Sequence, residues 1–164
     1  MVTRRAPALW VPDRQDVIWI DCNPQAGQEM RDIHPFLVLS PRAFNHRISL
    51  VIGLPMTTAA YNADNPFAVV AGVAGGAKVG KTSYVLCHQP KSFDWRARQA
   101  SPHPLKQLND AAFSEVRSLL NQIIALHHGQ HVRQHLGGGA VGECGVHHSA
   151  CARGNSRVLC AILG

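Results

Sequence analysis

Four side chains with acid, base or anion-binding chemistry lie within six residues in the first quarter of the chain. They belong to the segment NPQAGQEMRDIHP at positions 23–35 and are Glu29, Arg31, Asp32 and His34. A carboxylate, a guanidinium and an imidazole placed together can transfer protons and hold a phosphate group. The same residues also suit a solvated polar loop, and the segment alone does not separate the two interpretations.

The 164-residue chain has a formal net charge of +6, and many of its positive residues lie further along the chain. A basic surface favours a polyanionic partner, of which nucleic acid is the commonest. Between positions 76 and 106, cations and aromatic side chains alternate and Asp94 is the one acid. This pattern suits a groove in which phosphates pair with cations and bases stack on rings. The alternative is that the rings are core and the lysines a solvated face, which we expect for Phe93. The residues are Lys78, Lys81, Tyr84, Lys91, Phe93, Trp95, Arg96, Arg98 and Lys106.

Two other patterns suggest a nucleotide or a metal. Residues 75–82, GGAKVGKT, fit the phosphate-loop pattern, but that loop needs a helix directly after Lys81, and the following SYVLCHQP is β-like. We interpret the match as a glycine-rich hairpin loop and keep an NTPase as a weak alternative. Near the C-terminus, the C-x-x-H-H-x-x-C cluster contains zinc-type ligands but lacks a surrounding apolar segment. We therefore expect no metal and no cofactor. The cluster consists of Cys144, His147, His148 and Cys151.

The elements that must position these residues are short strands followed by one helix. Apolar runs bounded by turn residues predict five strands before any helix, which indicates a small β-barrel or sandwich. Asn109 or Asp110 can cap a helix whose apolar face has Phe113, Val116, Leu120 and Ile123. The segment 23–35 is then a long loop between the first two strands, and such loops are often functional. The predicted strands are 16–22, 36–40, 49–56, 67–73 and 83–87.

Composition changes after Leu126. Residues 127–164 are rich in histidine and glycine and have no lysine or sustained periodicity. We predict one folded domain at 1–126 and a tail at 127–164 that is disordered or extraneous. The start MVTRRAPALWVP lacks the apolar run of a signal peptide, so we expect a cytoplasmic protein whose five cysteines are free thiols.

Several motifs occur in the order found in one known family. Residues 11–41 read VPDRQDVIWIDCNPQAGQEMRDIHPFLVLSP, and residues 87–98 read CHQPKSFDWRAR. Between them come Phe44-Asn45, then PMTT at 55–58 and Pro66-Phe67. From about Val11 to Leu126 the chain resembles the MazF/PemK (Kid) family of toxin ribonucleases.

That resemblance implies an SH3-like small β-barrel with a C-terminal helix, mainly β and of the MazF/Kid/CcdB type, forming a homodimer. It implies the toxin of a type II toxin–antitoxin system that cleaves single-stranded RNA at short sequences. It also implies a cognate MazE-like antitoxin whose acidic segment covers the RNA groove.

The catalytic residues implied by the resemblance are partly altered. Glu29 matches the family's loop glutamate, and Thr57 matches the threonine placed at the scissile phosphate, with Thr58 beside it. His34 stands where the family has a catalytic arginine, and His88 where it has an aspartate before Gln89. Leu86 stands where one branch has a second arginine.

Histidine suits both proton steps of RNA transesterification, in which the 2′-hydroxyl attacks and leaves a 2′,3′-cyclic phosphate and a 5′-hydroxyl. Arg31 is the nearest guanidinium to replace the missing one. We therefore expect catalysis without metal. The alternative is a non-catalytic RNA- or partner-binding barrel. The expected catalytic residues are Glu29, Arg31, His34, Thr57 and His88, and the expected RNA contacts are Thr58, Lys78, Lys81, Tyr84, Gln89, Lys91, Arg96 and Arg98.

Overall fold

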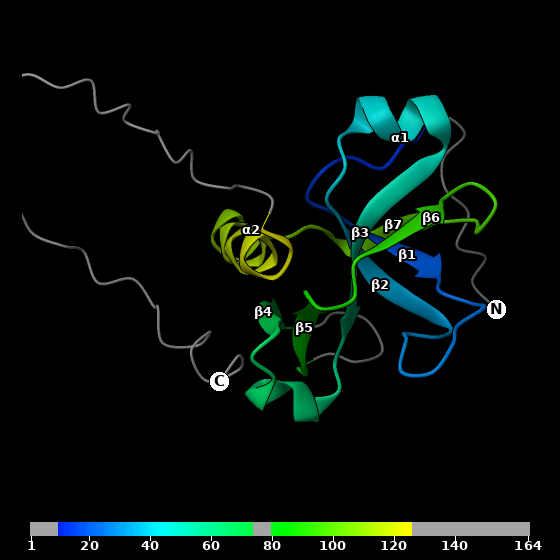
Figure 1. Cartoon of the computed structure of the whole chain (residues 1–164). Helices are drawn as coiled ribbons and strands as arrows, with labels where there is room; N and C mark the ends of the chain where they lie inside the picture. The colour runs from blue at the N-terminus through cyan, green and yellow to red at the C-terminus, as the bar shows by residue number, and fades with distance from the viewer. Residues whose placement is uncertain (1–9, 74–79, 126–164) are drawn as a thin grey trace, which may run out of the picture. The chain divides into compact units, whose positions relative to one another are not determined.

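The computed structural model describes residues 10–73 and 80–125, which lie in one compact unit. Seven strands, two α-helices and one short 3₁₀ helix follow one another along this part of the chain (Figure 1). Their bounds are β1 Asp16–Asp21, β2 Ile33–Val38, α1 Arg42–Ile48, β3 Leu50–Thr57, η1 Ala60–Asp64, β4 Ala68–Val73, β5 Thr82–Leu86, β6 Lys91–Asp94, β7 Ser101–Gln107 and α2 Asp110–Ile124.

All strand pairs are antiparallel, and β3 is the strand around which the curled sheet is organised. The order is β4-β5-β3-β2-β1-β7, and β6 joins β3 from the side. The first half of β3 pairs with β6, from Leu50 opposite Asp94 to Gly53 opposite Lys91. Its last residues, Met56 and Thr57, pair with β5. One strand therefore bends the sheet between two sets of partners, and the predicted mainly-β barrel fold with a closing helix is confirmed.

The middle of β1 and the later part of β2 are buried on both faces, which explains their apolar runs. Val17 and Leu37 point into a cluster with the helix residues Phe113 and Val116. Their neighbours Ile18, Phe36 and Val38 point into a second cluster. That second cluster is closed by Val51, Phe93 and Trp95.

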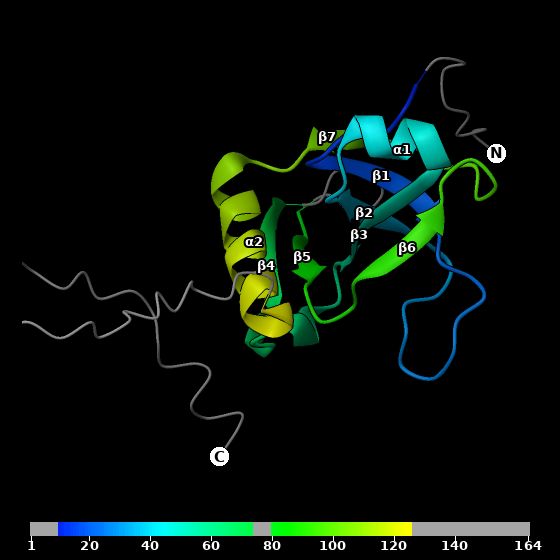
Figure 2. The ribbon, with the colours of Figure 1, turned by 45° about the horizontal axis from the view of Figure 1, so that its top comes forward.

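Helix α2 covers one side of the sheet beside β4 and β5 (Figure 2). Asn109 caps it as predicted, because its side chain accepts the Ala112 N–H at 2.9 Å. Phe113, Val116 and Leu120 are buried as expected. Ile123 was predicted on the same face but is 39% exposed, so the packed stripe ends one turn earlier.

The prediction of five strands before any helix was wrong in two respects. Helix α1 lies between β2 and β3, and its seven residues are too few to show a periodic pattern. It is held by Asn45, whose side-chain amide donates to the carbonyls of Pro12 and Ser40. Strands β6 and β7 were also missed. β7 contains Pro102 and Pro104, and prolines are tolerated there because β7 lies at the edge of the sheet.

The glycine-rich segment joins β4 to β5 as a hairpin, with Val73 opposite Thr82. The residues after Lys81 form a strand and not a helix, so the structural requirement for a phosphate-binding loop is not met. Residues 74–79 of this segment, and the cysteine–histidine cluster near the C-terminus, lie outside the described residues. No helix in the described part of the chain has the length and apolar composition needed to cross a membrane.

A chain ending at Leu126 is expected to unfold at nearly the same temperature as the full chain. The reason is that the core contacts of α2 end at Leu120, and its C-cap is completed by the Ala125 N–H donating to the Asn121 carbonyl at 2.8 Å. Thermal unfolding followed by circular dichroism checks this. A drop of many degrees in the shortened chain would show that residues 127–164 contribute to the fold.

Candidate active site

The β1–β2 loop, residues 22–32, is closed at its base by its own end residues. The Cys22 N–H donates to the Asp32 carbonyl at 2.9 Å. The Asn23 side-chain amide donates to Asp32 Oδ1 at 3.3 Å, and the Asp32 N–H donates back to Asn23 Oδ1 at 3.2 Å. Because β2 begins at Ile33, the loop is shorter than predicted, and His34 belongs to a strand.

Arg98 holds the same end of the loop from the connection after β6. Its guanidinium donates to the Asp21 carbonyl at 2.6 Å and to the Asn23 carbonyl. The guanidinium also stacks over the Phe93 ring, 4.3 Å from the ring centre. Arg98, which was predicted to contact RNA, therefore binds backbone carbonyls of the protein itself.

Two further predicted RNA contacts hold the far end of the loop. Gln89 Oε1 accepts the Met30 N–H at 3.0 Å, and Gln89 Nε2 donates to the Gln28 carbonyl at 3.4 Å. Lys91 Nζ donates to Glu29 Oε2 at 2.6 Å. The Lys91 hydrogen bond, together with one from the loop backbone, lowers the pKa of the Glu29 carboxyl below its usual value. Glu29 is therefore a carboxylate at neutral pH.

His34 is half-buried on β2, and its ring has a defined orientation. Nδ1 lies 3.3 Å from the Met56 carbonyl oxygen of β3. A carbonyl can only accept, so in the neutral ring Nδ1 carries the proton and Nε2 is the basic nitrogen. The strand pairing thus sets the tautomer in which Nε2 is the basic nitrogen of the ring.

Thr57 ends β3 one residue beyond the carbonyl that meets His34. Its hydroxyl oxygen accepts the Ala59 N–H at 3.2 Å, which fixes the turn leaving the strand. Thr58 is half-buried beside it. The structure therefore brings His34 and Thr57 to neighbouring strands at the same end of the β2–β3 pair.

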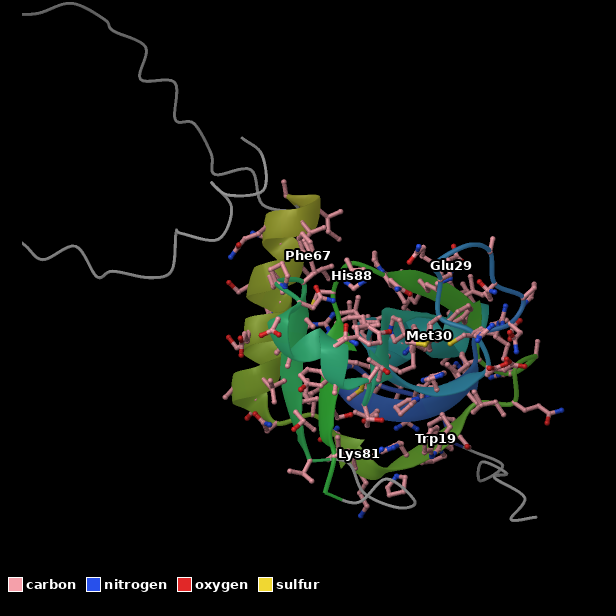
Figure 3. The ribbon with its side chains drawn as sticks, turned by 90° about the horizontal axis from the view of Figure 1, so that it is seen from below. Trp19, Glu29, Met30, Phe67, Lys81 and His88 are labelled. Atoms are coloured by element: carbon pink, nitrogen blue, oxygen red, sulfur yellow. The ribbon has the colours of Figure 1, made fainter. Side chains whose placement is uncertain are left out.

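His88 lies exposed in the turn after β5, on the side of Glu29 and Met30 (Figure 3). Its ring tilts against Phe67, with the ring centres 6.0 Å apart, and its Nε2 lies 3.4 Å from Gln89 Nε2. Gln89 thus links His88 to the loop that carries Glu29. Arg31 is exposed on that loop. No signal in the sequence indicated that the backbone of Gln28 and Met30 would fix the loop by binding Gln89.

The remaining predicted RNA contacts do not converge on this loop. Tyr84 is buried in β5, so the structure gives it no exposed ring for base stacking, and Phe93 and Trp95 are buried too. Lys81 is exposed but lies well away from Glu29 and His88 in Figure 3. Arg96 lies over the Trp95 ring, 4.9 Å from its centre. Lys78 lies outside the described residues.

The described cysteines are buried free thiols, as predicted for these two. Burial raises the pKa of Cys22 to about 11 and that of Cys87 to about 12. A thiol with such a pKa is protonated at neutral pH and is a poor nucleophile or metal ligand. Among residues 10–73 and 80–125, no three His, Cys, Asp or Glu side chains are grouped as metal ligands.

An apolar groove of about 920 Å³ lies between α2 and the α1–β3 side of the barrel. Exposed Phe44, Ile52 and Ile124 line it, and Arg14 and Arg117 supply positive charge. Ile124, an exposed apolar residue at the end of α2, is the sequence signal for it. An apolar groove with arginines suits a partner segment with apolar and acidic side chains.

Residues 13–124 match the family model of the PemK-like, MazF-like toxin of type II toxin–antitoxin systems. The chain belongs to this family. The match spans every strand and both helices of the described fold. The family match therefore covers the barrel and the closing helix together.

Characterised relatives and solved structures agree with this assignment. The chain is 37% identical over 92 residues to the endoribonuclease toxin MazF of Escherichia coli strain K12, covering 56% of this chain and 77% of the relative. It is 29% identical over 115 residues to the Escherichia coli endoribonuclease PemK, covering 68% and 81%. Crystalline MazF from Deinococcus radiodurans superposes with a TM-score of 0.61 at 32% identity, over 71% of this chain and 99% of that one.

Proposed function

We propose that this protein is the endoribonuclease toxin of a type II toxin–antitoxin system and that it cleaves single-stranded RNA at short sequences. The family match over residues 13–124 carries the proposal. Support comes from MazF and PemK, the relatives named endoribonucleases, which align with most of the barrel. The altered positions His34 and His88 both retain side chains that can transfer protons.

In the proposed mechanism, the RNA 2′-hydroxyl attacks the adjacent phosphate and the 5′-oxygen leaves. His34 Nε2 takes the proton of the attacking hydroxyl, since its Nδ1 faces the Met56 carbonyl. His88, exposed in the turn after β5, gives a proton to the leaving oxygen. Arg31 and the Thr57 hydroxyl bind the phosphate, and Glu29 is a carboxylate paired with Lys91. Such chemistry needs no metal, because the substrate supplies the nucleophile and imidazoles move the protons.

Cleavage is expected to persist in EDTA and to fail when the 2′-hydroxyl at the cut site is replaced by hydrogen. The reason is that the 2′-oxygen is the nucleophile in the proposed reaction. The measurement is incubation of the purified protein with a long, weakly structured RNA, followed by primer extension to map the cuts. A single 2′-deoxy substitution at the mapped site is then tested beside one placed several nucleotides away.

Undiminished cutting of the substrate that lacks the 2′-hydroxyl at the cut would overturn the mechanism. RNA binding without any cleavage would instead favour a non-catalytic barrel. One observation supports that second candidate: Leu86, where one branch of the family has an arginine, is an apolar residue only 4% exposed.

The partners we propose are a second copy of this chain and an antitoxin of the MazE type. A solved MazE–MazF complex from Deinococcus radiodurans has a TM-score of 0.56 at 29% identity, over 72% of this chain and 99% of that one. The apolar groove with Arg14 and Arg117 fits an acidic segment with apolar side chains, so it is a candidate surface for the antitoxin. Charge reversal at Arg117 is the corresponding binding test.

A further inference from the structure

Arg98 holds the base of the β1–β2 loop, and the short segment 88–91 attaches the far end of the loop to the barrel. At its far end the loop presents two backbone groups, the Met30 N–H and the Gln28 carbonyl, and both bind the amide of Gln89. The amide therefore acts as a substitute for a neighbouring strand, with its oxygen accepting and its nitrogen donating. Because the Met30 N–H must bond to an oxygen, the orientation of the Gln89 amide is determined.

Lys91 adds a charged contact next to this amide. Its side chain is only 15% exposed, whereas that of Glu29 is 49% exposed. The ammonium group lies 2.6 Å from the Glu29 carboxylate and 6.0 Å from the centre of the Phe93 ring. The lysine is therefore covered by the loop and already paired, which is a poor arrangement for receiving an RNA phosphate.

We propose that Gln89 and Lys91 are positioning residues: they act on RNA cleavage by holding the β1–β2 loop, with Glu29 and Arg31 on it, and not by binding RNA themselves. The predicted effect on cleavage rests on the proposed nuclease function. The contacts that hold the loop do not depend on that function. It replaces the expectation from the sequence that both side chains contact RNA. Loss of either contact should lower kcat and leave RNA affinity nearly unchanged.

The first test follows amide hydrogen exchange at Met30 in the full-length protein without RNA. Gln89→Leu removes the acceptor, and a net hydrogen bond of about 1 kcal/mol corresponds to roughly fivefold faster exchange. Gln89→Glu keeps an acceptor oxygen and should retain most of the protection. The exchange of core amides in β3 serves as a control for global unfolding. Unchanged protection of Met30 in Gln89→Leu would overturn the proposal.

The second test measures cleavage and binding separately. In Gln89→Leu, kcat should fall about tenfold, while the dissociation constant for an RNA with a 2′-deoxy cut site stays within twofold of the wild-type value. Lys91→Met should also lower kcat, and Lys91→Arg should restore most of it because a guanidinium can still pair with Glu29.

Salt dependence distinguishes holding the loop from direct contact. A lost phosphate contact reduces the slope of log affinity against log salt by about 0.7 for a single strand. Lys91→Met should leave that slope within error, and exposed Lys81→Met is the comparison for a lysine free to meet RNA. If Lys91→Met reduces this slope by about 0.7 while Met30 exchange stays unchanged, Lys91 is an RNA-binding residue and not a positioning residue. If the protein neither binds nor cuts RNA, the proposed function fails, while the exchange experiment still decides whether the loop is held.

Discussion

Replacing His34 by alanine is expected to lower the rate of RNA cleavage by about 10²–10⁴-fold, the usual contribution of a general base or acid. The physical reason lies in the β2–β3 pairing, which sets Nδ1 against the Met56 carbonyl and leaves Nε2 as the basic nitrogen. Alanine removes that nitrogen without altering the strand backbone. Single-turnover cleavage of an RNA with one mapped site is the measurement.

The pH profile separates a base from a merely structural histidine. A base works only when unprotonated, so the wild-type rate should rise with pH until the base has lost its proton. An imidazolium acid at His88 adds a fall at the upper end, which makes the profile bell-shaped. His34→Ala should lose the rising limb, and His88→Ala the falling one.

A histidine away from the site provides the matched control. His46 is exposed on α1, and His46→Ala should keep the wild-type rate and pH profile. If His34→Ala and His88→Ala also keep nearly full activity, the imidazole pair is wrong. Glu29 with Arg31 would then be the better catalytic candidates.

Gly53→Ala is expected to lower the free energy of unfolding by about 3 kcal/mol, the upper end of the usual cost of overpacking. A methyl group at this position would lie 2.1 Å from the Leu37 carbonyl oxygen and 2.5 Å from Phe36 Cε1. The nearest atom belongs to the backbone of β2, so it cannot move away as a flexible side chain would. Urea unfolding followed by circular dichroism measures the change.

The control for that substitution lies on the neighbouring strand. Ser92 on β6 is exposed and pairs with Ile52, and Ser92→Ala should change the unfolding free energy by less than about 0.5 kcal/mol. A stability loss below about 1 kcal/mol in Gly53→Ala would show that β2 and β3 can separate slightly at this point. The cleavage assay at low temperature then tells whether the site geometry has moved with them.

The strands with the strongest apolar runs were predictable, because burial on both faces leaves no polar alternation to confuse the pattern. β1 and the later part of β2 are examples. Helix α2 was predictable for another reason, namely its helical spacing of apolar residues and its Asn109 cap. α1 and β7 were not predictable in the same way. One is a seven-residue helix stabilised by the remote contacts of Asn45, and the other is a strand with two prolines that only an edge position permits.

By itself, the sequence determined the family, the mainly-β barrel with its closing helix, and the residue types available for proton transfer in and beside the β1–β2 loop. Only the tertiary structure decided what the nearby polar and aromatic side chains contact. Gln89, Lys91 and Arg98 looked like RNA contacts, but strand pairing places them against the loop backbone and Glu29, and it buries Tyr84. The reason is that composition and spacing report charge and periodicity along the chain, whereas a side chain's partner depends on the register of strands that are far apart in the sequence.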